Sequence, residues 1–470
     1  MEVGEAGLVR ALVGGSDARP HLDLGDGSDV ELAREYGQPA RKAFFMDRSA
    51  GVGRRGRQEA QSTRRGRPPP DDTFRAVASL GVYLHVPFCE RVCPYCDFAV
   101  VGVAGRGRKT LSSAVESRYV DALLSELEQR RSTWAGLELA SVYFGGGTPS
   151  LLSAESIGRL LDGVRGAFES ETRVEVTLEV NPSTTERERL PGFRAAGVTR
   201  LSIGLQSFDD TVLKRLGRAH RADEGRKTLA AARDSGFEQL SVDLLFGVPE
   251  QTEAALARDL AELSEFAPQH VSAYGLTIES GTPYARGVAA GTLELPEPDT
   301  AAAWTDRVWS ALEAAGLRQY EISSFARPGC EAVHNQRYWN RRPVLGLGMG
   351  AWSSEPRTEH APFGVRRSNV RELAPYLRAA ERRLAPDAGP AEVLSKETAR
   401  FEATFLALRT RDGLRAEGFE AEFGVTPRQL YGKAVDELRA GQMLRESENG
   451  DLRLTRRGRL LADSVLGRLL

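Results

Sequence analysis

The sequence has few cysteines, little net charge and no long apolar run, and each absence excludes a class of protein. The 470 residues include only four cysteines, which is too few for the disulfide framework of a secreted scaffold. The formal net charge of −2 gives no general attraction to nucleic acid. The apolar runs are far shorter than the roughly 18 residues that suggest a membrane span. We therefore expect a protein of a reducing compartment, with no transmembrane segment.

The amino terminus lacks a basic region followed by an apolar one. The opening MEVGEAGLVRALVGG carries Glu2 and Glu5, so we expect no secretory signal and a cytoplasmic protein. Residues 1–76 are rich in Gly, Arg, Ser and Pro and have no periodicity, which predicts a disordered, basic and glycine-rich extension. A second interpretation stays open, in which translation starts later, for instance at Met46. The acidic residues argue against a mitochondrial transit peptide.

From about residue 77 to residue 290, short β-rich segments alternate with helical ones. This alternation is typical of βαβ units around a parallel sheet and places the chain in the α/β class. Six units are fewer than a closed (β/α)8 barrel needs, so we predict an open, partial (β/α)6 barrel. In such barrels the functional groups gather at the carboxyl ends of the strands. The predicted strands are residues 81–87, 140–146, 175–180, 200–206, 240–247 and 270–276.

The remaining sequence predicts two further parts. Residues 291–395 form an extension with a helix at 300–316 and a strand at 320–326, and it ends in a Pro- and Ala-rich linker. Residues 396–470 are typical of a small, winged-helix-like α+β domain. Arg456, Arg457 and Arg459 in that domain suggest either contact with DNA or a solvated helix start, and the solvated helix start is favoured.

The strongest chemical signal is the spacing Cys89-x3-Cys93-x2-Cys96, directly after the first predicted strand. Three thiolates on one loop can hold three corners of a [4Fe–4S] cluster and leave the fourth iron open to a ligand with an amine and a carboxylate. The alternative is a zinc site completed by Cys330 or His85. Structural zinc sites usually take two pairs of ligands, and no second pair is present, so the cluster is favoured.

A glycine-rich turn and several polar residues follow the next strands. In Gly145–Pro149 the glycines let the backbone approach a ligand closely. Glu179, Gln206 and Asp243 lie at or near strand ends, and Arg218 lies in a helical stretch after the fourth strand. A carboxylate in an apolar strand is costly unless it is paired or bound to a ligand. We therefore favour a ligand-binding role over a purely structural one.

The segments YLHVPFCERVCPYCDF, FGGGTPS, LEVNP and IGLQSF together resemble the radical S-adenosylmethionine superfamily. Within it they are similar to the oxygen-independent coproporphyrinogen III oxidase group, over roughly residues 80–470. The resemblance implies a [4Fe–4S] cluster on Cys89, Cys93 and Cys96. It implies that an electron from this cluster cleaves S-adenosyl-L-methionine to a radical. The residues implied to contact S-adenosyl-L-methionine are Tyr83, Gly146, Gly147, Thr148, Glu179, Gln206, Arg218 and Asp243.

Two branches of that group differ at identifiable positions. The dehydrogenases carry an extra cysteine two positions after the third ligand, where this sequence has Phe98. The haem-chaperone branch, HemW, has CPYCDF in the cluster loop and an HNxxYW motif, which His334–Trp339 matches in full. The resemblance implies haem as a further cofactor, with His334 as an axial iron ligand and with Tyr338 and Trp339 as apolar faces for the porphyrin.

These motifs support three hypotheses about the function of the chain, and we favour the first. It is a haem chaperone that hands haem to haem-dependent proteins, and the resemblance is consistent with a homodimer. The alternative is a coproporphyrinogen III dehydrogenase of porphyrin biosynthesis, against which Phe98 argues. The third is an RNA-modifying radical enzyme, but the balanced charge and the absence of interleaved aromatic and basic residues disfavour nucleic acid. No catalytic residue is assigned.

Overall fold

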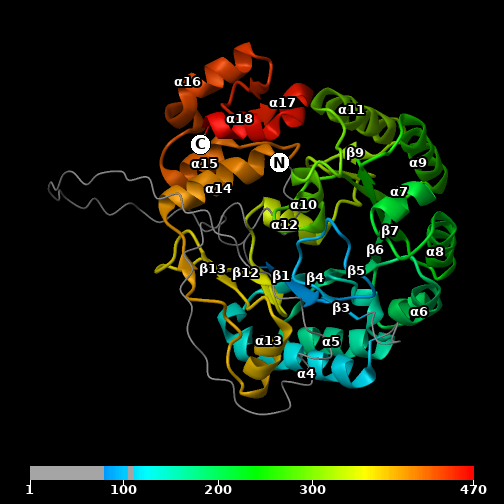
Figure 1. The fold of residues 1–470 in the computed structure, drawn as a ribbon. Helices are drawn as coiled ribbons and strands as arrows, with labels where there is room; N and C mark the ends of the chain where they lie inside the picture. The colour runs from blue at the N-terminus through cyan, green and yellow to red at the C-terminus, as the bar shows by residue number, and fades with distance from the viewer. Residues whose placement is uncertain (1–78, 104–110, 470) are drawn as a thin grey trace.

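A mixed sheet of twelve strands forms the centre of the molecule (Figure 1). The computed structural model describes residues 79–103 and 111–469, so the extension predicted for residues 1–76 lies outside the described residues. The six predicted strands are all present and pair in parallel in chain order, which confirms the α/β class. They are β1 (Ser79–Val86), β4 (Glu138–Gly146), β5 (Ser170–Val180), β6 (Arg200–Gln206), β7 (Gln239–Phe246) and β8 (His270–Gly275).

Helices cover the outer face of these strands. Strand β6 shows why, because Leu201, Ile203 and Leu205 are fully buried on its outer face and pack in the main apolar core. The intervening positions face inward, as the two-residue period of a strand requires. Gly197 and Gly236 have φ values of +105° and +79° at the ends of two helices, as predicted. The helices of this layer are α4 (Ser113–Arg130), α5 (Ala154–Ala167), α6 (Thr184–Ala195), α7 (Asp210–Arg215), α8 (Ala222–Asp234) and α9 (Glu253–Phe266).

The sheet extends beyond the six predicted strands at both edges. Strand β11 (Val344–Leu347) pairs in parallel with β1, on the side away from β4. Antiparallel strands then complete that edge, and two more lie at the other edge beside β8. The sheet therefore does not close on itself, which confirms the open, partial barrel. The antiparallel strands are β12 (Trp352–Glu355), β13 (Val365–Ser368), β14 (Glu392–Val393), β10 (Ser324–Ala326) and β9 (Arg318–Gln319).

The C-terminal elements pack around an apolar core of their own, which includes Phe419, Phe423 and Leu438. They are α14 (Lys396–Leu408), α15 (Ala416–Phe423), α16 (Pro427–Ala440), the hairpin β15 (Leu444–Glu446) and β16 (Leu452–Leu454), α17 (Arg456–Leu460) and α18 (Ala462–Leu469). The other helices are α10 (Pro283–Ala289), α11 (Pro298–Ala314), α12 (Val333–Trp339) and α13 (Leu373–Glu381). Among the helices that the structure describes, none has the length and apolar character to cross a membrane.

The arginines of α17 dock these C-terminal elements onto α11 (Figure 1). Arg456 donates hydrogen bonds to Asp306 at 2.5 Å and to Glu313 at 3.0 Å. The guanidinium carbons of Arg456 and Arg459 lie 5.7 and 5.9 Å from the centre of the Trp309 ring. The prediction of a solvated helix start is therefore wrong for these two arginines, because they form a contact between two parts of the chain.

A buried carboxylate ties α4 to the loop after β11. Glu126 is 1% exposed and accepts hydrogen bonds from the backbone N–H of Gly348 at 2.9 Å and from Asn369 at 2.7 Å. It also accepts from the Tyr376 hydroxyl at 2.9 Å and from Arg130 at 2.8 Å. Since all four donors converge on one buried group, Glu126 holds β11 and α13 against the helix layer.

We expect Glu126→Ala to lower the free energy of unfolding by about 3 kcal/mol or more. It leaves the buried Gly348 N–H and the Tyr376 hydroxyl without an acceptor and removes the partly buried ion pair with Arg130. Urea denaturation followed by circular dichroism measures this loss. Glu128→Ala is the matched control, since Glu128 lies on the same helix and its ion pair with Arg131 is exposed. It should change stability by less than about 1 kcal/mol. Equal effects of the two substitutions would contradict the account.

Candidate functional site

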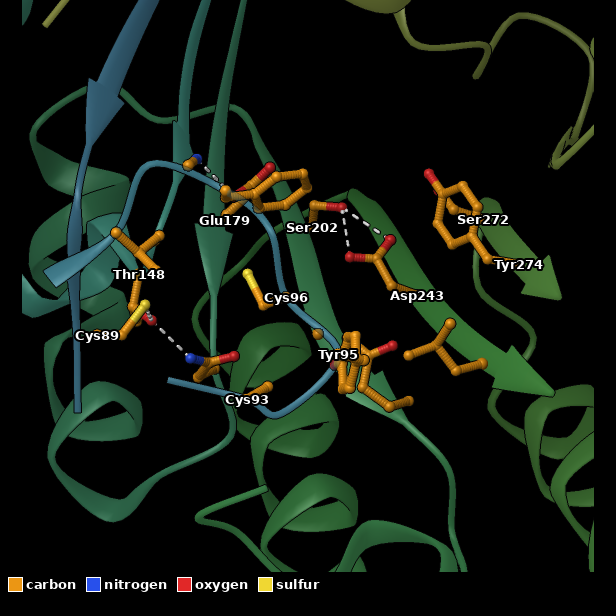
Figure 2. A pocket seen from close by; sticks show the side chains of 18 of the residues that line it. Cys89, Cys93, Tyr95, Cys96, Thr148, Glu179, Ser202, Asp243, Ser272 and Tyr274 are labelled. Atoms are coloured by element: carbon orange, nitrogen blue, oxygen red, sulfur yellow. Dashed lines mark hydrogen bonds between the residues drawn. The ribbon is translucent and has the colours of Figure 1, made fainter. Parts of the chain in front are cut away.

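A cavity of about 300 Å³ opens at the carboxyl ends of the parallel strands (Figure 2). It is lined by ten of the residues singled out in the sequence, which come from several different strands and loops. Figure 2 shows the labelled cysteine side chains around the same space as Glu179 and Asp243. The ten residues are Cys89, Cys93, Cys96, Gly146, Gly147, Thr148, Glu179, Gln206, Arg218 and Asp243. Tyr83 and His334 do not line it.

The cysteine loop is held in place by backbone hydrogen bonds. The short strands β2 (Phe88–Cys89) and β3 (Val101–Gly102) pair in parallel across its base. The N–H of Val103 donates to the Cys89 carbonyl at 2.8 Å, and the N–H of Cys96 donates to the Cys93 carbonyl at 3.1 Å. All four cysteines are free thiols, and Cys330 lies outside the cavity. The loop therefore presents three thiols to the cavity from a fixed backbone.

Burial keeps two of these thiols, those of Cys89 and Cys96, protonated. Burial raises the pKa of the Cys89 and Cys96 thiols to about 12, and the neighbouring cysteines add to the effect. In residues 79–103 and 111–469, no three His, Cys, Asp or Glu side chains are placed to share one metal ion. A four-iron cluster needs no such shared point, because each thiolate binds a different iron. Three soft sulfur donors on one loop are thus a donor set that fits an iron–sulfur cluster.

The glycine-rich turn packs directly against the cysteine loop. Gly146 has a φ of +110°, and the N–H of Thr148 donates to the Phe88 carbonyl at 2.7 Å. A Cβ atom on Gly147 would lie 2.7 Å from the backbone of Pro87 and Phe88. Glycine is therefore required at Gly147 by the close approach of the cysteine loop's backbone. The close approach to a ligand that the sequence predicted for this turn stays a prediction.

Two half-buried carboxylates face the cavity from β5 and β7. Glu179 accepts hydrogen bonds from the Tyr143 hydroxyl at 2.9 Å and from the Gly146 N–H at 3.2 Å. Burial, and then the charge of Asp243, raises the pKa of Glu179 to about 7. Asp243 accepts from the Ser202 hydroxyl at 3.2 Å, and burial raises its pKa to about 6. Both groups retain oxygen atoms that can accept hydrogen bonds from a ligand's hydroxyl or amine groups.

A chain of polar contacts joins the cysteine loop to the glycine-rich turn. Arg218 donates to the Gly204 carbonyl at 2.8 Å, to Asn181, and to the sulfur of Cys93 at 3.8 Å. The Asn181 amide in turn donates to Thr148 at 2.7 Å, whose hydroxyl lies 3.8 Å from the Cys89 sulfur. Asn181 was missed as a site residue although it follows Val180 in the LEVNP segment. Its position at the carboxyl end of a predicted strand was the available signal.

The floor of the cavity is polar, and its residues were not predicted as site residues from the sequence. Arg200, Ser202, Ser272 and Asn335 line it. Arg200 is 1% exposed, and the terminal nitrogens of its guanidinium have no hydrogen-bond partner among the described residues. The inward positions of β6 alternate with its outward apolar residues, so the two-residue period was the signal for Arg200 and Ser202. Asn335 comes from α12, far away in the sequence, and no local pattern indicates it.

The HNxxYW motif forms helix α12, which packs against the inner face of the sheet. His334 is 1% exposed, and its two ring nitrogens lie 2.9 Å from the Ser141 hydroxyl and 3.1 Å from the Tyr338 hydroxyl. Glu175 accepts hydrogen bonds from the backbone N–H groups of Val333 and His334 at 3.0 Å. Burial lowers the pKa of His334 to about 3, so the ring is neutral. Both ring nitrogens of this buried side chain are engaged, so a haem iron could bond to His334 only after one of these two contacts is broken.

Comparison with known proteins identifies two family models in the chain. Residues 83–286 match the Radical SAM superfamily, and residues 394–461 match the HemN C-terminal domain. The chain is 32% identical to the heme chaperone HemW of Bacillus subtilis, over 83% of this chain and 98% of that protein. It is 37% identical to HemW of Mycobacterium tuberculosis, over 83% of this chain and 95% of that protein.

Among solved structures, the chain is similar to the coproporphyrinogen III oxidase HemN of Escherichia coli, which is described as a radical SAM enzyme. The TM-score is 0.70 over 85% of this chain and 93% of that one, at 23% sequence identity. At this identity the likeness shows a shared fold. It agrees with the α/β fold described above.

We expect Gly147→Ala to destabilise the protein by about 1–3 kcal/mol, because the added methyl group overlaps the backbone of the cysteine loop. The free energy of unfolding in urea measures the effect. Gly166→Ala is the control, since a Cβ there meets nothing within 4 Å and lies in helix α5. It should leave stability unchanged or raise it by up to about 1 kcal/mol. A Gly147→Ala protein as stable as the control would show that the turn is not packed in this way.

Proposed function

The chain belongs to the HemW family of radical SAM proteins, and on that premise we propose that it is a haem chaperone that binds haem and delivers it to haem-dependent proteins. The observation that carries the proposal is the identity of 32–37% over 95–98% of the length of the HemW relatives. The cavity supports it, because the same residues that the resemblance implied as ligands of a cluster and its partner molecule converge there.

We propose that Cys89, Cys93 and Cys96 hold a [4Fe–4S] cluster and that S-adenosyl-L-methionine occupies the cavity beside it. When bound, the cluster supplies the electron for reductive cleavage of the sulfonium. The protein supplies position: the turn at Gly146 and Gly147 lets a ligand approach the backbone closely. The other proposed contacts are made by Thr148, Glu179, Gln206, Arg218 and Asp243. Tyr83 remains a predicted contact outside the cavity lining.

Glu179 and Asp243 have the clearest role in this binding. As acceptors that retain partly unused oxygen atoms, they orient hydroxyl or amine groups of the ligand. Arg218 fixes the two walls of the cavity by bonding to Asn181 and Gly204 while it lies near the Cys93 sulfur. All three side chains are half-buried, and a ligand bound against them would displace water from around them, which strengthens each polar contact.

The dehydrogenase reading receives less support. Its extra cysteine is replaced by Phe98, whose side chain is 42% exposed and lines the cavity. At 23% sequence identity, the likeness to HemN shows a shared fold and carries no activity over to this chain.

We further propose that the protein works in the cytoplasm, because its four cysteines are all free thiols, as in a reducing compartment.

Haem added to the anaerobically reconstituted protein is expected to bind saturably at about one per chain, because a chaperone must hold its cargo before transfer. Soret absorbance in a titration measures this binding. His360→Ala is the control for the histidine series, since His360 is exposed and should leave the titration unchanged.

His334→Ala in the same titration decides the role of that histidine. A shifted Soret maximum with at least tenfold weaker binding would identify His334 as the axial ligand, reached once one of its two ring contacts is broken. An unchanged spectrum would place the ligand elsewhere and leave His334 with the structural contacts described above. Absence of saturable binding by the wild-type protein would contradict the proposed function itself.

A further inference from the structure

The cavity has a rim whose chemistry differs from that of its floor. The floor is polar, with Arg200, Ser202 and Asn335, whereas Val92 and Phe98 line the cavity from the cysteine loop. These two side chains are 40% and 42% exposed and are among the few large apolar side chains on the described surface. We call them the apolar rim. A polar ligand such as S-adenosyl-L-methionine has no need of such a rim, so it is left unexplained by the proposed cofactors.

Single exposed apolar residues are ordinary on a protein surface, and two on one loop do not by themselves indicate a binding site. That observation is their place at a concave opening. Their loop is fixed by its backbone bonds at Val101 and Val103, so it holds them there in the free protein. Concave, partly apolar sites suit small molecules, whereas a stable protein partner covers roughly 800 Å² on each side. The rim is therefore better matched to a small, flat, apolar ligand than to a protein.

A cation accompanies the rim. Arg91 is exposed, precedes Val92 directly and also lines the cavity. Arg91 makes no hydrogen bond or ion pair with any residue that the structure describes. By contrast, Arg371 donates to the carbonyl of Asp97, on the cysteine loop, at 3.0 Å. An aromatic ring, an aliphatic side chain and a guanidinium, all from one loop that lines the cavity, are complementary to a flat macrocycle that carries carboxylates.

We propose that the apolar rim is the docking face for haem, with the macrocycle packed on Phe98 and Val92 and a propionate paired with Arg91. The inference rests on the proposed haem-binding function and gives it a location. It puts haem over the opening of the cavity, at the position where the dehydrogenases carry a cysteine. It makes Phe98 a specificity-determining residue rather than a neutral replacement, and it separates haem docking from the buried His334.

The test is a haem titration of the full, anaerobically reconstituted chain with Phe98→Ala and a matched control. Phe401→Ala is that control, because Phe401 is 36% exposed on α14 and does not line the cavity. Loss of the ring contact and its buried area is expected to raise the haem Kd about tenfold in Phe98→Ala. Phe401→Ala should match the wild type, and Phe98→Tyr should restore most of the affinity. Iron content and circular dichroism confirm that each variant is folded and loaded.

A second measurement tests the charged contact. The wild type should bind haem more tightly than haem dimethyl ester, and Arg91→Gln should abolish most of this difference because the ester has no carboxylate to pair. A wild type that binds haem while Phe98→Ala binds it equally well would overturn the inference and leave the proposed function intact. If Phe98→Ala only converts a dimer to a monomer, the apolar rim is a contact between two copies of the chain. That result would also overturn the inference. Failure of the wild type to bind haem is a failure of the proposed function.

Discussion

The alternation of side chains along the parallel strands is the constraint on which the rest of this structure depends. On β6, Leu201, Ile203 and Leu205 are buried under the helices, while the alternate positions Arg200, Ser202, Gly204 and Gln206 line the cavity. Every second residue of a strand faces the interior of the open barrel. Polar side chains at those positions of neighbouring strands therefore lie close together in the cavity. A slip of one residue in register would exchange the core and the site on that strand.

The interior is then completed by segments far away in the sequence. Helix α12 packs against the inner face of the strands through His334 and Ser141, and it contributes Asn335 to the cavity floor. The buried Glu126 holds the loop after β11 against α4, and so extends the sheet on the side away from β4. The mouth of the cavity carries the cysteine loop, where thiols, an exposed aromatic ring and an exposed arginine lie within a few residues of one another.

Much of this architecture was predictable because its signals are local. The six parallel strands and their helices follow from two-residue and helical periodicities. Motifs at and after the strand ends, together with the family resemblance, indicated ten of the cavity's residues, including Cys89, Gly147 and Glu179. Other features depend on contacts that no local pattern records. Strand β11 is only Val344–Leu347 and pairs with a strand more than 250 residues earlier, and Arg456 was read as solvated because its partners lie on α11. His334 was expected to present a nitrogen to haem, and its burial against Ser141 could be seen only once α12 was placed.

The central claim is that three cysteines on one loop hold a four-iron cluster. Iron, sulfide and zinc analysis of the anaerobically reconstituted protein tests it most directly, with Cys93→Ser and Cys330→Ser alongside. Because Cys330 lies outside the cavity, we predict about four irons and four sulfides per chain in the wild type and in Cys330→Ser, and their loss in Cys93→Ser. About one zinc per chain, with no sulfide and with zinc lost in Cys330→Ser, would contradict the account.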